Sequence, residues 1–162
     1  DADAQTANWE AQKAEERAAR AGDDGVRPSA LDGVPVGMPA LTRAEKLTRR
    51  AARVGFDWPH ADQVFDKMEE EIGELRTEIA GGAPRERLEA ELGDLLFCMA
   101  NLARHLKIDP EHALRAANAK FTRRFGRIET LLAEDGRTPT ESDLGEMDAL
   151  WNRAKAEERG EL

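Results

Sequence analysis

The sequence predicts an all-α protein, folded as an antiparallel helical bundle of about five to six helices. Ala, Leu, Glu and Arg dominate the composition, and these residues favour helices. Residues that favour strands are scarce: aromatic residues make up 5% of the chain, and Tyr is absent. With 162 residues, 40% of them apolar, the chain suits one domain whose core is a few packed helices.

Turn residues and apolar spacing divide the first part of the chain into two helices and a linker. Residues 4–21 predict a polar, Ala-rich helix, and residues 22–38, rich in Gly and Pro, predict a loop or linker. The second expected helix begins at Pro39, because proline suits a first helical position. It ends near Val54, since Gly55 favours helix termination.

The third and fourth expected helices, roughly residues 60–80 and 84–106, carry apolar residues at alternating spacings of three and four. This pattern indicates a helix with one buried face. Only Gly81-Gly82-Ala83 links them, and so short a loop implies antiparallel neighbours. The apolar positions are Phe65, Met68, Ile72, Leu75 and Ile79 in the third helix and Leu88, Leu92, Leu95, Met99, Leu102 and Leu106 in the fourth.

The fifth expected helix follows Asp109, a typical N-cap residue, and has Pro110 in its first turn. It runs to about Ala133, and the last expected helix covers about residues 142–158. We expect helices three to five to form the core of the bundle, with the earlier helices packed around it.

Charge and cysteine content exclude several classes of partner. The formal net charge of −9 argues against a large nucleic-acid surface, which requires a basic footprint. A small phosphorylated ligand stays possible, because a polyvalent metal inverts the local field. The sequence has no run of about 18 apolar residues, and therefore no membrane span is predicted. One cysteine, Cys98, fits a reducing, cytoplasmic setting, and we expect it to be a small buried residue.

Two acidic pairs lie beside the apolar stripes of the third and fourth helices. Glu71 and Glu74, and likewise Glu91 and Asp94, are three residues apart and share a helix face. In the antiparallel pair, Glu71 lies level with Asp94 and Glu74 with Glu91. Four carboxylates this close repel one another, and a magnesium ion, which prefers oxygen ligands and often retains phosphates, removes the conflict. The alternative is that these acids are simply solvated.

Cations on the fifth helix occupy the same flanking position as the acids. Lys120 and Arg124 precede Phe121 and Phe125, and from there they could contact substrate phosphates. They could equally be surface charges or counter-ions of the acids. For the second helix we favour a solvated face over a second phosphate-binding wall; its cations are Arg43, Lys46, Arg50 and Arg53.

Three aromatic residues, Phe56, Trp58 and Trp151, could stack a nucleobase, although tryptophans in an aromatic-poor chain are more often part of the core. The histidines show no metal-ligand spacing and are assigned no role; they are His60, His105 and His112.

The acidic residues match a known pattern. Glu70-Glu71-x-x-Glu74, a gap of sixteen residues and Glu91-x-x-Asp94 resemble the signature of the all-α NTP pyrophosphohydrolases. The surroundings resemble the C-terminal catalytic domain of the two-domain proteins of the MazG family, over about residues 28–156. They include Arg50-Ala51-Ala52-Arg53-Val54-Gly55-Phe56-Asp57-Trp58-Pro59, Gly93-Asp94-Leu95-Leu96-Phe97, Asn101-Leu102-Ala103-Arg104-His105-Leu106, Lys120-Phe121-x-Arg123-Arg124-Phe125 and Met147-Asp148-Ala149-Leu150-Trp151.

The resemblance implies hydrolysis of nucleoside triphosphates to monophosphate and pyrophosphate, as in nucleotide-pool clean-up. It implies magnesium, with manganese as a substitute, and homodimers or larger assemblies whose site is completed between subunits. By this resemblance the metal ligands are Glu71, Glu74, Glu91 and Asp94, the nucleotide contacts are Lys120, Arg124 and Trp151, and the catalytic acids are Glu70, Glu71 and Glu74. Either Glu70 or Glu74 could hold or deprotonate the attacking water, and Glu70 could instead support the metal ligands without binding the metal itself.

We expect residues 1–27 to be an N-terminal helix and linker, residues 28–158 the hydrolase domain and residues 159–162 a tail. The first residue is Asp1, which suggests a fragment of a longer protein. Two other functions stay open. One is a hydrolase of dUTP, dCTP or phosphoribosyl-ATP on the same scaffold, and the other is a non-enzymatic helical interaction module.

Overall fold

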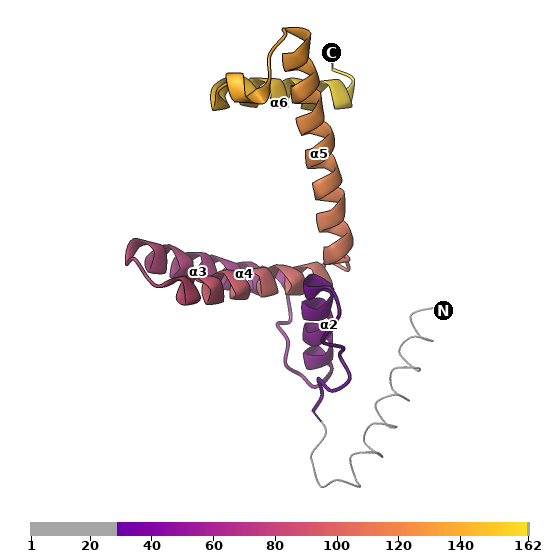
Figure 1. Ribbon diagram of the computed structural model, residues 1–162. Coiled ribbons are helices and arrows are strands. Elements are labelled where there is room, and N and C mark those ends of the chain that lie inside the picture. The colour runs from indigo at the N-terminus through magenta and orange to yellow at the C-terminus, as the bar shows by residue number, and fades with distance from the viewer. Residues whose placement is uncertain (1–28, 162) are drawn as a thin grey trace, which may run out of the picture. The chain divides into compact units, whose positions relative to one another are not determined.

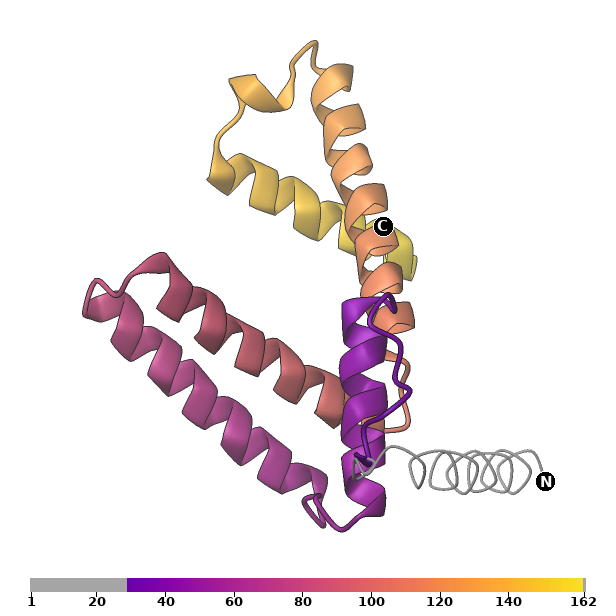
Figure 2. The same ribbon diagram turned by 60° about the horizontal axis from the view of Figure 1, so that its bottom comes forward.

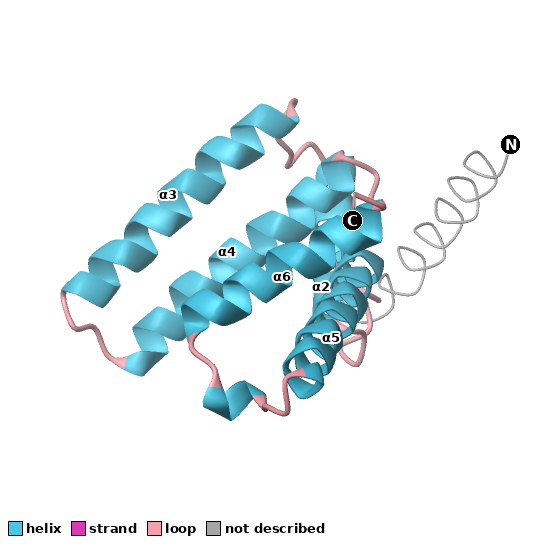
Figure 3. Ribbon diagram, turned by 90° about the horizontal axis from the view of Figure 1, so that it is seen from above, coloured by secondary structure: helices cyan, strands magenta, loops and turns pink. Residues whose placement is uncertain are grey.

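The computed structural model describes residues 29–161, so the helix expected over residues 4–21 lies outside the described residues. Every regular element in the described part is a helix, which confirms the all-α class (Figure 3). The elements are α2 (Ala40–Arg53), α3 (Ala61–Ala80), α4 (Arg85–His105), α5 (Pro110–Glu134), the short 3-10 helix η1 (Pro139–Glu141) and α6 (Leu144–Arg159).

The described chain forms two compact units that divide between Ile108 and Asp109. In the first unit α3 and α4 form the predicted antiparallel hairpin, and α2 packs against α4 (Figures 1 and 2). Gly82 in the hairpin turn has a φ of 65°, a conformation that glycine adopts without steric cost. The hairpin therefore brings the acidic pairs of α3 and α4 to the same level.

The buried core of the first unit is small. Val64 and Ala100 are fully buried and Cys98 is nearly so, as expected for the thiol. Several apolar positions expected to be buried are half exposed in the single chain, and this part of the sequence prediction is wrong. They are Phe65 and Ile79 on α3 and Leu92, Met99 and Leu106 on α4. The periodicity identified an apolar face but not what covers it.

The second unit consists of α5, η1 and α6. The Asp109 side chain caps α5 as predicted, accepting a hydrogen bond from the backbone N–H of His112 at 3.0 Å. Its core lies between α5 and α6 and contains Ile128, Leu132 and Ala154. The caps and this core fix the faces that α5 and α6 present to each other.

The helix boundaries differ from the expected ones by a few residues at most. Pro39 is the N-cap of α2 and not its first residue, and Pro84 has the same place before α4. The expected bundle core of helices three to five stays a prediction, as do the domain boundaries at residues 28 and 158. Among residues 29–161, no helix has the length and apolar character needed to cross a membrane.

Candidate functional site

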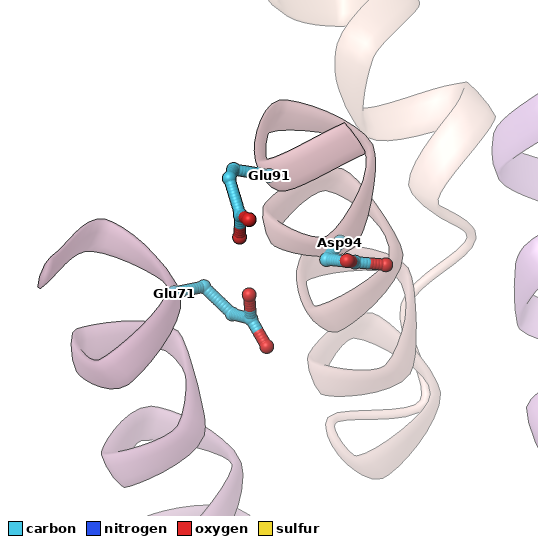
Figure 4. A group of neighbouring side chains, drawn as sticks. All are labelled: Glu71, Glu91 and Asp94. Atoms are coloured by element: carbon cyan, nitrogen blue, oxygen red, sulfur yellow. The ribbon is translucent and has the colours of Figure 1, made fainter. Parts of the chain in front are cut away.

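Three of the four predicted metal-binding carboxylates converge between α3 and α4. Glu71, Glu91 and Asp94 each offer one oxygen that lies within 4.8 Å of the other two. Figure 4 shows Glu71 extending from α3 toward α4, which carries Glu91 and Asp94. The hairpin thus assembles an all-oxygen set of ligand atoms, which is the chemistry that a hard divalent cation prefers.

Glu71 is the buried member of this group, with 4% of its surface exposed. Its Oε1 lies 2.8 Å from Nζ of Lys67. Its Oε2 is buried and has no hydrogen-bond partner in the described part of the chain. A buried carboxylate oxygen without a partner is costly, because that oxygen has lost its hydrogen bonds to water and gained no other in return. A cation between Glu71 and the acids of α4 would satisfy that oxygen.

Glu74, the fourth predicted ligand, is exposed and does not belong to the group of converging oxygens. Its charge is still felt across the hairpin. The pKa of Glu91 is raised, first by the partial burial of its carboxyl and then by the negative charges of Glu74 and Glu71. The like-charge conflict expected from the sequence is therefore present at Glu91, and Glu74 as a ligand stays a prediction.

Lys67 is a cation at this site that the sequence reasoning missed. Its Nζ lies 3.0 Å from Oε1 of Glu70 and also binds Glu71, and these two hydrogen bonds raise the pKa of the lysine. The spacing of three and four residues along one helix was the signal that could have revealed it. Lys67 holds the exposed Glu70 carboxylate beside the buried Glu71.

The second unit brings together two of the three predicted nucleotide contacts. The guanidinium of Arg124 lies 5.5 Å from the centroid of the Trp151 ring, which is also 5.4 Å from the Phe121 ring. Lys120 is exposed and makes no ion pair with any residue between 29 and 161. The predicted cation and aromatic therefore form one surface, with Lys120 apart from the cation–π pair.

Glu158, which the sequence reasoning also missed, forms an ion pair with the guanidinium of Arg124. Its Oε2 accepts a hydrogen bond from Nε of Arg124 at 2.8 Å, while Oε1 accepts one from Nε of Arg123 at 2.7 Å. These bonds, that of Arg124 first, lower the pKa of the Glu158 carboxyl. No sequence pattern indicates this contact, because Arg124 and Glu158 lie 34 positions apart on two different helices. An anionic ligand at Arg124 would compete with Glu158.

The aromatic residues before α3 are not core residues, which corrects the favoured interpretation. Phe56 is 80% exposed and Trp58 is 37% exposed. They lie in the loop after α2, where Gly55 has a φ of 86° and turns the chain away from the helix. Loop residues project from the surface, so helical burial does not apply to them.

These aromatics border a cavity of about 490 Å³ between α2, α4 and the loop. It is lined by Leu31, Leu47, Thr48, Ala51, Gly55, Phe56, Asp57, Trp58, Phe97, Cys98 and Asn101. Cys98 lies one helical turn after Asp94, and its burial and the negative charge of Glu71 raise the pKa of the thiol. The cavity therefore begins one turn of α4 beyond the carboxylate group.

Two of the four cations of α2 depart from the solvated face that we favoured. Arg50 donates a hydrogen bond to the backbone carbonyl of Asp32, which ties the chain before α2 to the helix. Arg43 is partly buried, and its Nε is buried without a partner among the described residues. Arg43 also lines a second hollow with apolar residues of α2 and α4.

Comparison with known proteins identifies the family. Residues 61–127, which include the carboxylate group, match the model of the MazG nucleotide pyrophosphohydrolase domain. The chain is 45% identical over 153 residues to the nucleoside triphosphate pyrophosphohydrolase of Escherichia coli (strain K12), covering 94% of this chain and 56% of that protein.

Two further relatives are similar over nearly the whole chain. The chain is 40% identical to the nucleoside triphosphate pyrophosphohydrolase/pyrophosphatase MazG of Thermotoga maritima, over 91% of this chain and 54% of the relative. It is 42% identical to the uncharacterized protein YabN of Bacillus subtilis (strain 168), over 94% of this chain and 30% of the relative. The chain thus spans about half the length, or less, of the curated relatives that it matches.

Proposed function

The chain belongs to the MazG family of nucleotide pyrophosphohydrolases, and from this premise we propose that it hydrolyses nucleoside triphosphates to nucleoside monophosphate and pyrophosphate. The proposed reaction depends on magnesium, for which manganese can substitute. Its proposed purpose is to remove unwanted nucleotides from the cellular pool. The matched domain and the identity to named triphosphate pyrophosphohydrolases support this reaction over the other functions considered.

The observation that carries the proposal is the buried, unpartnered Oε2 of Glu71, a carboxylate that converges with those of Glu91 and Asp94. This donor set fits a hard divalent cation, which Glu71, Glu91 and Asp94 would hold, with Glu74 as the proposed fourth ligand. When bound, such a cation neutralises phosphate charge and lowers the pKa of a coordinated water. Without it, the three converging acids repel one another, and Lys67 pairs with only one of them, Glu71.

The side chains of the protein have distinct proposed roles in the reaction. Glu70 or Glu74 holds or deprotonates the water that attacks the α-phosphorus in line with the departing pyrophosphate. Lys67 keeps the Glu70 carboxylate beside the metal-binding group. Lys120 and Arg124 bind the phosphates and stabilise the charge that develops, and Trp151 contacts the nucleotide.

The cavity beyond Cys98 is the proposed site for the base and sugar of the nucleotide. Its volume of about 490 Å³ falls in the roughly 300–1,000 Å³ range of small-molecule sites, and its lining is mostly apolar. Trp58 and Phe56 supply aromatic faces at its border, and a nucleobase can stack on such faces. A triphosphate extending from the cavity along α4 would reach the carboxylates within one helical turn.

The exposed apolar residues of α3 and α4 support a homodimer or higher homo-oligomer. Phe65, Leu92 and Met99 are each 44–48% exposed in the single chain, although they belong to the apolar faces of their helices. Covering such residues removes apolar surface from water, which stabilises the covered state by about 25 cal/mol for each Å² buried. A second copy of the chain is the proposed cover, and the concentration dependence of the mass in solution tests it.

Product analysis in oxygen-18 water tests the proposed reaction. The chain is incubated with magnesium and a panel of ribo- and deoxyribonucleoside triphosphates and phosphoribosyl-ATP, and the products are separated. We expect label in the monophosphate and none in pyrophosphate, because water attacks the α-phosphorus. Orthophosphate and diphosphate as products would refute the assigned bond. Turnover of dUTP, dCTP or phosphoribosyl-ATP alone would favour the narrower hydrolases.

A non-enzymatic interaction module makes a different prediction. Such a protein would show no hydrolysis of any member of the panel and no change in melting temperature on addition of magnesium or manganese.

A further inference from the structure

A buried amide lines the proposed base and sugar cavity. Asn101 on α4 is 3% exposed, and apart from Thr48 and Asp57 the other lining residues are apolar or glycine. The Thr48 hydroxyl donates a hydrogen bond to the carbonyl of Glu45 at 2.9 Å, and it is therefore already used by α2. Asn101 thus offers a neutral polar group to a ligand in a largely apolar cavity.

The orientation of this amide is fixed by Arg104. Nε and Nη2 of Arg104 donate to Oδ1 of Asn101 at 3.0 and 2.8 Å. A guanidinium has only N–H donors, so its partner must be the amide oxygen and not the amide nitrogen. The Asn101 amide nitrogen has no hydrogen bond to any residue from 29 to 161. Its donors are therefore free to meet an acceptor in the cavity.

Arg104 also holds the wall of the cavity. Its Nη2 donates to Oδ1 of Asp57, which lies 3.2 Å from Nε2 of His105. Burial alone raises the pKa of Asp57, but hydrogen bonds and charge from Arg104, with a further contribution from His105, bring that pKa below its usual value. Asp57 belongs to the loop that carries Phe56 and Trp58. One guanidinium therefore fixes both the donor inside the cavity and the loop that borders it.

We propose that Asn101 is a specificity-determining residue, whose amide N–H donates a hydrogen bond to an acceptor on the edge of the nucleobase, and that Arg104 is its positioning residue. The inference rests on the proposed function, because it assigns the base of that substrate to this cavity. The acceptor is a carbonyl oxygen or a ring nitrogen. A buried donor left without an acceptor is costly, so the cavity disfavours a substrate that has no base.

The test compares two substrates in the same protein. For the wild-type chain and for Asn101→Leu, kcat/KM is measured with a nucleoside triphosphate and with ribose 5-triphosphate, which has no base. We expect the ratio of the two values to fall about tenfold in the variant, since one neutral hydrogen bond is lost. A general loss of folded protein lowers both values equally and leaves the ratio unchanged.

Two further variants separate the donor from its positioning. Asn101→Asp keeps an oxygen for Arg104 but removes the donor, and it should lower the ratio at least as much, which also covers a failure of the leucine variant to fold. Arg104→Lys keeps a positive charge near Asp57 but loses the fork on Asn101, and it should lower the ratio mainly through KM for the nucleotide.

An unchanged ratio in folded Asn101→Leu or Asn101→Asp would overturn the role of Asn101. An unchanged ratio in Arg104→Lys alone would overturn the positioning role. Absence of hydrolysis of every triphosphate by the wild-type chain would instead refute the proposed function, and the inference with it.

Discussion

Two groups of charged side chains, one in each unit of the chain, differ in whether the fold supplies their counter-ions. In the first unit, Glu91 and Asp94 have no ion pair with any described residue, although they face a third carboxylate. In the second unit the fold supplies its own counter-ions, since Arg123 and Arg124 share Glu158. Glu91 and Asp94 are thus left without a counter-ion in the described part of the chain, whereas these cations of α5 are already neutralised.

The carboxylate group therefore requires a cation to offset its repulsion, whereas the Arg124 site can bind an anion but does not need one for stability. Repulsion among carboxylates costs stability until a cation joins them, so the hairpin gains from a metal whether or not substrate is present. When a phosphate binds an Arg that is already paired with Glu, the free energy gained is only the difference between the Arg–phosphate and the Arg–carboxylate interactions. This asymmetry predicts larger effects for substitutions in the carboxylate group than for substitutions in the second unit.

The largest effect is expected from Glu71→Gln, which removes the buried charge at the metal-binding group. Activity should fall by roughly a thousandfold or more, because several kcal/mol of charge stabilisation are lost. Magnesium at a hundredfold excess over Kd should stabilise the wild-type chain by about 2.7 kcal/mol, and the variant by much less. Kinetics and thermal melts with and without metal measure both effects.

In metal-free buffer the same variant should differ little from the wild-type chain in melting temperature, since an amide at this position no longer repels Glu91 but also loses the ion pair with Lys67. The matched control is Glu69→Gln, an exposed acid on the same helix that is absent from the converging group. It should retain activity and the response to metal. Equal responses of Glu71→Gln and Glu69→Gln to magnesium would eliminate Glu71 as a ligand.

The second effect concerns the cations of α5. Lys120→Ala and Arg124→Ala should each lower kcat/KM by roughly a hundredfold, or about 2–4 kcal/mol, if they stabilise the transition state. Arg124→Lys should recover only part of this loss, because an ammonium cannot replace the bidentate fork. Arg123→Ala is the control, since Arg123 also binds Glu158, whereas the cation–π pair with Trp151 is made by Arg124. Near-normal turnover in both alanine variants would show that other cations, such as Arg43, bind the phosphates.

The register of the carboxylates could be predicted from the sequence, but their surroundings could not. Apolar periodicity and the link at Gly82 place Glu71 beside Asp94, because both are local features of two helices. The pair of Asp57 and Arg104 spans 47 residues, and no periodicity encodes such a contact. Side chains that meet through the packing of distant elements depend on tertiary structure, which a single sequence does not display.

Burial was the other property that the pattern could not supply. Met99 and Cys98 are neighbours on α4, yet Met99 is 44% exposed and Cys98 is 7% exposed. The spacing of three and four identifies apolar positions, but exposure depends on which neighbours cover them. The expectation that Trp58 belongs to the core was wrong for a related reason: it rested on residue type, whereas the position of Trp58 in a loop leaves it 37% exposed.

A smaller effect is expected from Glu158→Gln, which tests whether the fold's own anion competes with substrate. Removing the charge should free Arg124, so KM for the nucleotide should fall by about two- to fivefold, as expected when a competing exposed ion pair worth up to about 1 kcal/mol is lost. Initial-rate kinetics at several ionic strengths measure the change, which should shrink at high salt. A rise in KM would show instead that Glu158 positions Arg124 for binding.

The smallest effect is expected from the pair of Arg137 and Glu146, which represents the neutralised charges of the second unit. Hydrogen bonds from Arg137, and then from Ser142, lower the pKa of Glu146 from 4.5 to about 2. A carboxyl with a lowered pKa contributes stability that is complete above its unfolded pKa and is lost as the pH falls through its folded pKa. The contribution should therefore be full above about pH 5 and should disappear as the pH approaches 2.

Thermal melts of the wild-type chain and Arg137→Gln across this pH range measure the contribution of the pair to stability. The difference in melting temperature should be small, because the pair is partly exposed, and it should narrow toward acid pH. A difference that stays constant with pH would mean that Arg137 stabilises the second unit mainly through its hydrogen bond to the carbonyl of Glu141, and not through the charge of Glu146.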